Sequence, residues 1–148
     1  MFNGTKKELS LELTLDPYLI YQGQAEEAIA FYGAALGLEH GEINRYKDSP
    51  MPHTAAQKNW IMHCELLDQG RCIAMVADTT EVNSGNQIQL SLNYKAVDLE
   101  KMKIAFDQLA EGGKITQPLE KQFWNATFGQ LIDRFGIHWM MNCNHETT

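Results

Sequence analysis

Residues 123–142 read FWNATFGQLIDRFGIHWMMN, and this stretch carries the clearest structural pattern of the chain. It contains two runs rich in apolar and aromatic residues, 126–132 and 136–143, separated by the turn-forming residues Asp133 to Gly136. Two such runs joined by a short turn are typical of a β-hairpin. The stretch therefore predicts a pair of antiparallel strands near the end of the chain.

The turn of this hairpin resembles a turn found earlier in the chain. The sequence LIDRFG at 131–136 matches LLDQG at 66–70 with one inserted residue. The earlier turn also joins two strand-like runs, 60–67 and 71–77, which predicts a second hairpin. The chain thus shows the same local plan twice, as an internal repeat would.

Each hairpin follows a segment with helical periodicity. In QAEEAIAFYGAALGL, residues 24–38, apolar side chains recur at helical spacing, and Gly37 is suited to end the helix. In the second half, Asp98 can cap a helix that ends at Gly112 and Gly113. Both halves therefore place one helix before their hairpin.

The remaining segments complete the two halves. Leucines alternate with polar residues from Leu9, which predicts a strand over 9–21 that Asp16-Pro17 interrupts. The polar stretch 47–59 has the length of a lid or binding loop. Further strands are expected at 39–46, 87–94 and 114–119, and a polar linker at 79–86.

These elements predict a single α+β domain over residues 1–148. It would contain two βαβββ modules, one at 9–80 and one at 85–145. The length of 148 residues is that of one domain, and the composition of 44% hydrophobic and 21% charged residues is that of a globular protein.

Charge and composition exclude several classes of partner. The formal net charge is −7, whereas surfaces that bind nucleic acid or anionic membranes are usually basic. The three cysteines have no disulfide or zinc-site spacing, and no apolar run has the length of a membrane span. We therefore expect a cytoplasmic protein with no nucleic-acid or membrane partner.

Three stretches together resemble a known family. They are PYLIYQGQAEEAIAFYGAALGLE, IMHCELLDQGRCIAMVAD and EGGKITQPLEKQFWNATFGQLIDRFGIHWMMN. They resemble the PhnB-like branch of the vicinal oxygen chelate superfamily, which includes glyoxalase I, bleomycin-resistance proteins and extradiol dioxygenases. The resemblance covers nearly the whole chain, from about Pro17 to Asn142. It implies paired modules whose curved mixed sheets enclose a cavity, and usually a homodimer.

Some members of this branch have carried a demethylubiquinone methyltransferase label. The sequence argues against that activity, because it has no glycine-rich GxGxG turn and no alternating βα units. A Rossmann-type methyltransferase holds its cofactor on such a turn.

The resemblance also implies four metal-ligand positions in the metal-dependent members. In this chain they fall at Pro17, at Ala74 or Met75, at Gln87 and at Met140. Proline and alanine cannot bind a metal, methionine prefers soft ions, and a lone glutamine is a weak ligand. We therefore expect no cofactor and no metal residues. A divalent ion at a non-standard site is the alternative.

Strand alternation locates the cavity face. With a two-residue turn at Gln69-Gly70, Glu65 would lie opposite Ala74 and His63 opposite Val76. The resemblance implies that Ala74 faces the cavity, so His63 and Glu65 would face it as well. The same alternation adds further lining residues: Leu19, Tyr21, Gln89, Ser91, Asn93, His138, Met140 and Asn142.

Two functions remain open for this face. The first is metal-free binding of a small molecule, with ligand contacts from Tyr21, Asn93, Trp124, Met140 and Asn142. The second is a glyoxalase- or dioxygenase-type enzyme, in which His63 and Glu65 form an acid–base pair. A histidine with a purely structural hydrogen bond is the alternative for His63, and Trp124 would either stack on a planar ligand or pack in a contact.

Overall fold

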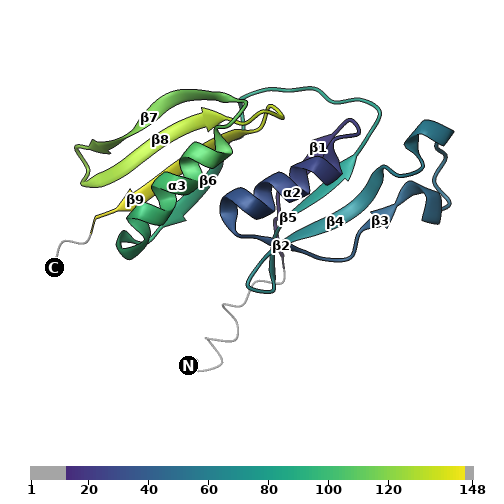
Figure 1. Ribbon diagram of the computed structural model, residues 1–148, viewed down its shortest axis with the longest axis horizontal. Helices are drawn as coiled ribbons and strands as arrows, with labels where there is room; N and C mark the ends of the chain where they lie inside the picture. The colour runs from purple at the N-terminus through teal and green to yellow at the C-terminus, as the bar shows by residue number, and fades with distance from the viewer. Residues whose placement is uncertain (1–12, 146–148) are drawn as a thin grey trace.

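The computed structural model describes residues 13–145 (Figure 1). Each half begins with a strand and a helix and ends in an antiparallel hairpin. The first half contains β1 (Tyr18–Tyr21), α2 (Ala25–Leu36), β2 (Glu39–His40), β3 (Asn44–Arg45), β4 (Ile61–Asp68) and β5 (Arg71–Asp78). The second half contains β6 (Leu90–Tyr94), α3 (Leu99–Leu109), β7 (Lys114–Gln122), β8 (Ala126–Ile132) and β9 (His138–Asn144).

The strands form two mixed sheets. The first has the order β1-β5-β4-β2, with β3 also paired to β4, and the second has the order β6-β9-β8-β7. In each sheet the first strand of the module pairs in parallel with the last, and the other pairs are antiparallel. The predicted α+β fold of paired modules is confirmed. The sheets stay open, with β1 and β6 as edge strands.

Both helices lie on the same side of the two sheets and pack against each other (Figure 1). The buried core lies between the two helices and the two sheets, and it includes Tyr32, Met102, Phe106 and Trp139. No helix covers the opposite side of either sheet within residues 13–145. We call this side the open face. Neither helix has the length and apolar character needed to cross a bilayer.

The first strand is shorter than the sequence pattern predicts. Residues 9–12 lie outside the described part, and residues 13–17 form no strand. Leu13 and Leu15 are exposed, so their alternation with polar residues does not reflect a buried sheet face. The strand starts at Tyr18, because Pro17 has no amide hydrogen for a ladder.

The long polar segment is a paired arm and does not form a lid over the second sheet. Its base continues the β3–β4 pairing, with hydrogen bonds from the Tyr46 amide to the Trp60 carbonyl and from Lys47 to Lys58. Short 3-10 turns at Tyr46–Asp48 and Ala55–Gln57 shape it. It extends from the first sheet away from the second (Figure 1).

The register of the first hairpin differs from the prediction by one residue. The turn has two residues, Gln69 and Gly70, both with positive φ, and Asp68 pairs with Arg71 as expected. A bulge beyond Leu67 then leaves one extra residue on β5, so that Glu65 pairs with Met75 and not with Ala74. Ala74 is therefore buried on the helix side.

The helix ends follow the sequence more closely. Gly37 adopts the left-handed conformation, with φ of 69°, immediately after α2. Asp98 precedes α3 as predicted, but its side chain makes no capping hydrogen bond. The α3 helix ends at Leu109, three residues before Gly112.

Candidate functional site

His63 and Glu65 lie on the open face of β4. Their neighbours Cys64 and Leu66 are buried against the helices, and alternation along the strand turns His63 and Glu65 to the other side. The Nδ1 atom of His63 is 3.0 Å from the hydroxyl oxygen of Tyr18, and the two rings meet edge to face. The partner of His63 is thus Tyr18, and no hydrogen bond joins His63 to Glu65.

Tyr18 takes the place that the sequence pattern assigned to Tyr21. In the parallel β1–β5 pair, Tyr18 aligns with Met75. Burial raises the pKa of Tyr18, and nearby Tyr46 adds to the shift. Leu19 and Tyr21 do not lie on the open face beside His63, because both side chains are buried in the core against the helices.

Tyr21 belongs instead to a buried hydrogen-bond chain. Its hydroxyl donates to the Tyr32 hydroxyl at 2.8 Å, and Tyr32 donates to the Asp133 carboxylate at 2.6 Å. Burial is the main cause that raises the pKa of both tyrosines, so they stay neutral donors. The chain connects β1 and α2 to the turn of the second hairpin.

The second sheet places its predicted residues on the open face. Trp139, Met141 and Cys143 are buried on the helix side, so the intervening residues of β9 point the other way. Along the sheet, Ser91 pairs with Met140, and Asn93 pairs with Asn142. The open-face residues of β6 and β9 are Ser91, Asn93, His138, Met140 and Asn142.

Trp124 stands at the tip of the β7–β8 hairpin. Its ring contacts Phe123 and Phe128 edge to face, with centroids 4.9 and 5.8 Å apart. Phe128 pairs with Asn142, so this aromatic group lies at the end of the open face of the second sheet.

The predicted site residues therefore fall into two groups on different sheets. His63 and Glu65 belong to the first sheet, and Asn93, Met140 and Asn142 to the second. No hydrogen bond or ion pair within residues 13–145 joins the groups, and Figure 1 shows the two sheets side by side. One chain alone does not bring them into a single cluster.

A hollow of about 520 Å³ lies between the two sheets, where the edge strands β1 and β6 approach each other. We call it the seam hollow. Its lining comes from β1, the linker, the start of β6 and the second hairpin turn. These residues are Pro17, Tyr18, Leu19, Ile20, Glu81, Val82, Asn83, Ser84, Gly85, Ile88, Leu90, Phe135, Gly136, Ile137 and His138.

Apolar side chains are left exposed around the seam hollow. Tyr18, Val82 and Ile88 are 44%, 41% and 81% exposed. A group of exposed apolar residues at a concave surface is typical of a binding site. The sequence predicts only a polar linker at 79–86; the apolar residues Val82 within it and Ile88 just after it are the signal that could have indicated the hollow.

A smaller hollow of about 220 Å³ continues from the first. The two share Ile20, Val82, Ser84 and Phe135, and the smaller one adds Tyr21, Gln22 and Gln24. Tyr21 thus borders this hollow although its hydroxyl is bonded to Tyr32.

Two buried aspartates fix the walls near these hollows. One oxygen of Asp133 accepts hydrogen bonds from the amides of Phe135 and Ile137, and the other accepts from Tyr32 and from the Trp139 indole. All four bonds are 2.6 to 3.0 Å long. Asp133 is therefore a turn-forming residue with no free acceptor directed at a ligand.

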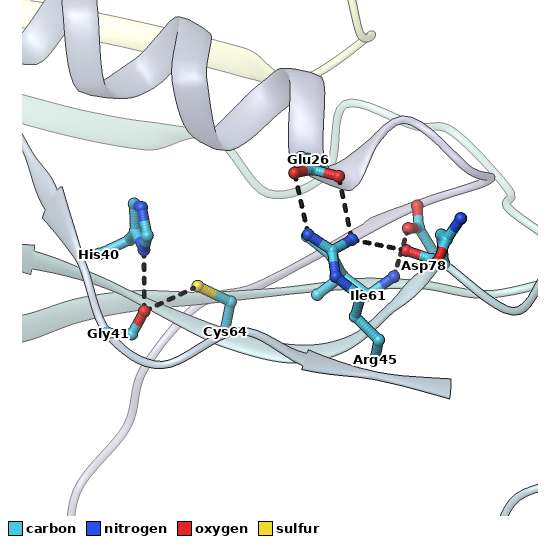
Figure 2. A network of polar contacts seen from close by, with 8 residues as sticks. Glu26, His40, Gly41, Arg45, Ile61, Cys64 and Asp78 are labelled. Atoms are coloured by element: carbon cyan, nitrogen blue, oxygen red, sulfur yellow. Dashed lines mark hydrogen bonds and ion pairs between the residues drawn. The ribbon is translucent and has the colours of Figure 1, made fainter. Parts of the chain in front are cut away.

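Asp78, the last residue of β5, is likewise fully hydrogen-bonded and binds backbone amides at the start of α2. One oxygen of its carboxylate accepts hydrogen bonds from the amides of Gly23 and Ala25. The other oxygen accepts a hydrogen bond from the amide of Ile61 (Figure 2). Beside it, the two terminal guanidinium nitrogens of Arg45 donate to the two carboxylate oxygens of Glu26, each at 3.0 Å (Figure 2). These hydrogen bonds connect the first turn of α2 to the first sheet and fix its position.

The four predicted ligand positions do not fit a divalent metal. After the register correction, they carry Pro17, Met75, Gln87 and Met140, none of which supplies an imidazole or carboxylate. Within residues 13–145, no group of three or more histidine, cysteine, aspartate or glutamate side chains could hold a metal ion. Cys64, Cys72 and Cys143 are unpaired.

Two open mixed sheets, each from a βαβββ module, and a hollow between them define a paired-module α+β protein. Residues 14–141 match the Glyoxalase/Bleomycin resistance protein/Dioxygenase superfamily. The chain belongs to this superfamily.

Individual relatives support the PhnB-like resemblance. Protein YjdN of Escherichia coli (strain K12) is 29% identical over 140 residues, which are 88% of this chain and 95% of that protein. The crystal structure of protein PA1353 from Pseudomonas aeruginosa has 34% identity and a TM-score of 0.79, and it covers 91% of this chain and 100% of that one.

A third relative has a name that refers to an activity. It is a putative 3-demethylubiquinone-9 3-methyltransferase, PhnB protein, from Bacillus cereus, with 24% identity and a TM-score of 0.72. The similarity covers 88% of this chain and 99% of that one. At this level of identity the likeness shows the fold alone.

Proposed function

We propose that this protein binds a small organic molecule in the seam hollow and does so without the metal quartet of its superfamily. The observation that carries the proposal is the hollow itself. Its volume of about 520 Å³ lies in the range of small-molecule sites. Its wall combines exposed apolar residues with polar groups such as Tyr18 and His138.

The superfamily name covers both catalytic proteins and resistance proteins, and a shared fold does not decide between them. The residues at the metal positions favour binding, because they lack the donors that a divalent ion needs. The two buried aspartates near the hollow are fully hydrogen-bonded, so neither is available as an acid–base group.

A plug in the seam hollow tests this proposal. A Cβ atom at Gly85 would meet nothing within 4 Å, so Gly85→Trp places a large ring there without strain on the backbone. Aromatic and dicarbonyl metabolites are screened by thermal shift, and hits are measured by calorimetry. We expect Gly85→Trp to weaken binding by about tenfold or more, equivalent to about 1.4 kcal/mol.

Asn86→Trp is the matched control, because Asn86 is the exposed neighbour of Gly85 and does not line the hollow. It should bind hits as tightly as the unmodified protein. If Gly85→Trp folds and binds every hit with unchanged affinity, the hollow is not the site.

A glyoxalase- or dioxygenase-type enzyme is the second candidate, because His63 lies on the open face with its Nδ1 atom beside Tyr18, a residue of the hollow wall. In a binding protein, His63→Ala frees the Tyr18 hydroxyl and weakens binding while the melting temperature stays nearly unchanged. In an enzyme, the same variant abolishes conversion of a bound metabolite, which NMR of the mixture would reveal.

A further inference from the structure

The side chains around the seam hollow provide no permanent positive charge. Its lining contains no lysine and no arginine, and its ionisable side chains other than Tyr18 are Glu81 and His138. Glu65 adds a carboxylate on the adjoining open face. Glu65 and Glu81 have no ion-pair partner among residues 13–145.

The nearest arginine along the chain is already engaged. Arg134 precedes Phe135 of the hollow wall, but its guanidinium is 2.7 Å from the Glu27 carboxylate. It also lies over the ring of Phe31, 4.6 Å from the centroid. Its charge is therefore directed at α2 and matched there.

The second hairpin turn, which forms one part of the hollow wall, offers no free amide. Turns with successive amide groups often bind anions, and residues 135–137 form such a turn beside the hollow. However, the amides of Phe135 and Ile137 donate to the Asp133 carboxylate, and the Gly136 amide donates to the Asp133 carbonyl. All three amides are occupied from within the protein.

The start of α2 borders the smaller hollow through Gln22 and Gln24, and a helix N-terminus is ordinarily an anion site. Here the carboxylate of Asp78 accepts the amides of Gly23 and Ala25 at 2.7 and 3.0 Å. Glu26 and Glu27 add negative charge in the first turn. The helix end is thus already neutralised.

From these observations we infer that the seam hollow accepts uncharged or cationic ligands and rejects anions such as phosphonates and carboxylates. The inference rests on the proposed function and narrows its ligand class. An anion that enters the hollow loses its hydration and gains no cationic side chain in return. The net charge of −7 further disfavours its approach.

Three probes that share a phenyl ring test the inference. They are benzyl alcohol, the benzyltrimethylammonium cation and phenylphosphonate, titrated by NMR at pH 8, where histidine side chains are ordinarily neutral. We expect the first two to bind at least about tenfold more tightly than phenylphosphonate. Gly85→Trp should weaken the binding of both benzyl alcohol and the benzyltrimethylammonium cation.

A designed charge gives the converse test. Ile88 lines the hollow and is largely exposed, so Ile88→Arg adds a cation at the wall without disturbing the core. This variant should bind phenylphosphonate at least about tenfold more tightly than the unmodified protein. The control is Ile104→Arg, because Ile104 is exposed on α3 and does not line the hollow. It should leave the affinity for phenylphosphonate unchanged.

Two results would overturn the inference. One is phenylphosphonate binding to the unmodified protein as tightly as benzyl alcohol, and the other is no binding by any of the three probes. In either case the proposed function stands if the metabolite screen yields ligands that Gly85→Trp displaces. It fails separately if the screen yields none.

Discussion

Asp68 and Asp133 occupy corresponding positions in the two hairpin turns, yet their environments differ. The side chain of Asp68 is 47% exposed and its carboxylate lies 4.0 Å from the Arg71 guanidinium. Asp133 is 2% exposed and accepts four hydrogen bonds, two of them from side chains that belong to different modules. The turn of the second hairpin is thus buried where the two modules meet, whereas the turn of the first hairpin lies on the surface.

We predict that Asp133→Asn lowers the free energy of unfolding by about 3 kcal/mol, because the amide group of asparagine would face two donors that need an acceptor. Asp68→Asn is the matched control and should change stability by less than about 0.5 kcal/mol. Urea unfolding followed by circular dichroism measures both. Equal effects of the two substitutions would contradict the role of Asp133 as a buried junction.

Alternation along β9 correctly predicted its open-face residues, but alternation along β1 did not. The predicted break at Asp16-Pro17 and the short strand after it are confirmed, but Leu19 and Tyr21 of that strand are buried on the helix side. As a result, Tyr18 and not Tyr21 is the neighbour of His63. The exposed leucines before Pro17 contained no information about which face of the sheet Tyr18 and Tyr21 occupy.

In the second module, the backbone of Gly113 lies very close to the backbone of Ile132 and Asp133. A Cβ atom at Gly113 would overlap the carbonyl oxygen of Ile132 and touch the backbone of Asp133. Gly113 immediately precedes β7, whose first residue Lys114 pairs with Ile132 of β8. Glycine is therefore needed where β7 starts beside the hairpin turn.

We predict that Gly113→Ala lowers the free energy of unfolding by about 2 kcal/mol, because the backbones of β7 and β8 must separate to admit the methyl group. Gly85→Ala serves as the control, since an added Cβ there meets no atom within 4 Å. Thermal unfolding compares the two variants. A Gly113→Ala variant as stable as Gly85→Ala would show that β7 can shift freely.

Among the elements, the hairpins and helices were predictable because each has a local signal: a turn, a periodic stripe or a terminal glycine. The bulge at Leu67 was not, because an extra residue on β5 leaves the apolar pattern of both strands intact. The arm at 46–60 was also missed. Its backbone pairing extends β3 and β4 through polar residues that resemble a loop.

The two modules are held together on the helix side of the sheets. Tyr32 of α2 donates to Asp133, and Glu27 of α2 pairs with Arg134, so α2 contacts the turn of the second hairpin. The sequence predicted two modules but not this contact, which joins residues about one hundred positions apart. The contact fixes both open faces on the same side of the chain.

These open faces lead us to predict a twofold-symmetric dimer. Phe123 is 96% exposed beside Trp124, and half-buried Met140 lies on the uncovered side of β9. The edge strands β1 and β6 also carry unpaired backbone groups along the seam. Pairing of two copies through their open faces would bury these apolar groups, and residues of the second copy would then lie against the open face of each sheet.

Light scattering on the unmodified protein at micromolar concentration should give twice the chain mass of 16.8 kDa. Met140→Glu should shift the protein toward the monomer, because the interface would have to bury a carboxylate with no partner. Ile104→Glu, on the exposed side of α3, is the control and should remain dimeric. A mass of 16.8 kDa for the unmodified protein would show that one chain alone leaves the open faces to solvent or ligand.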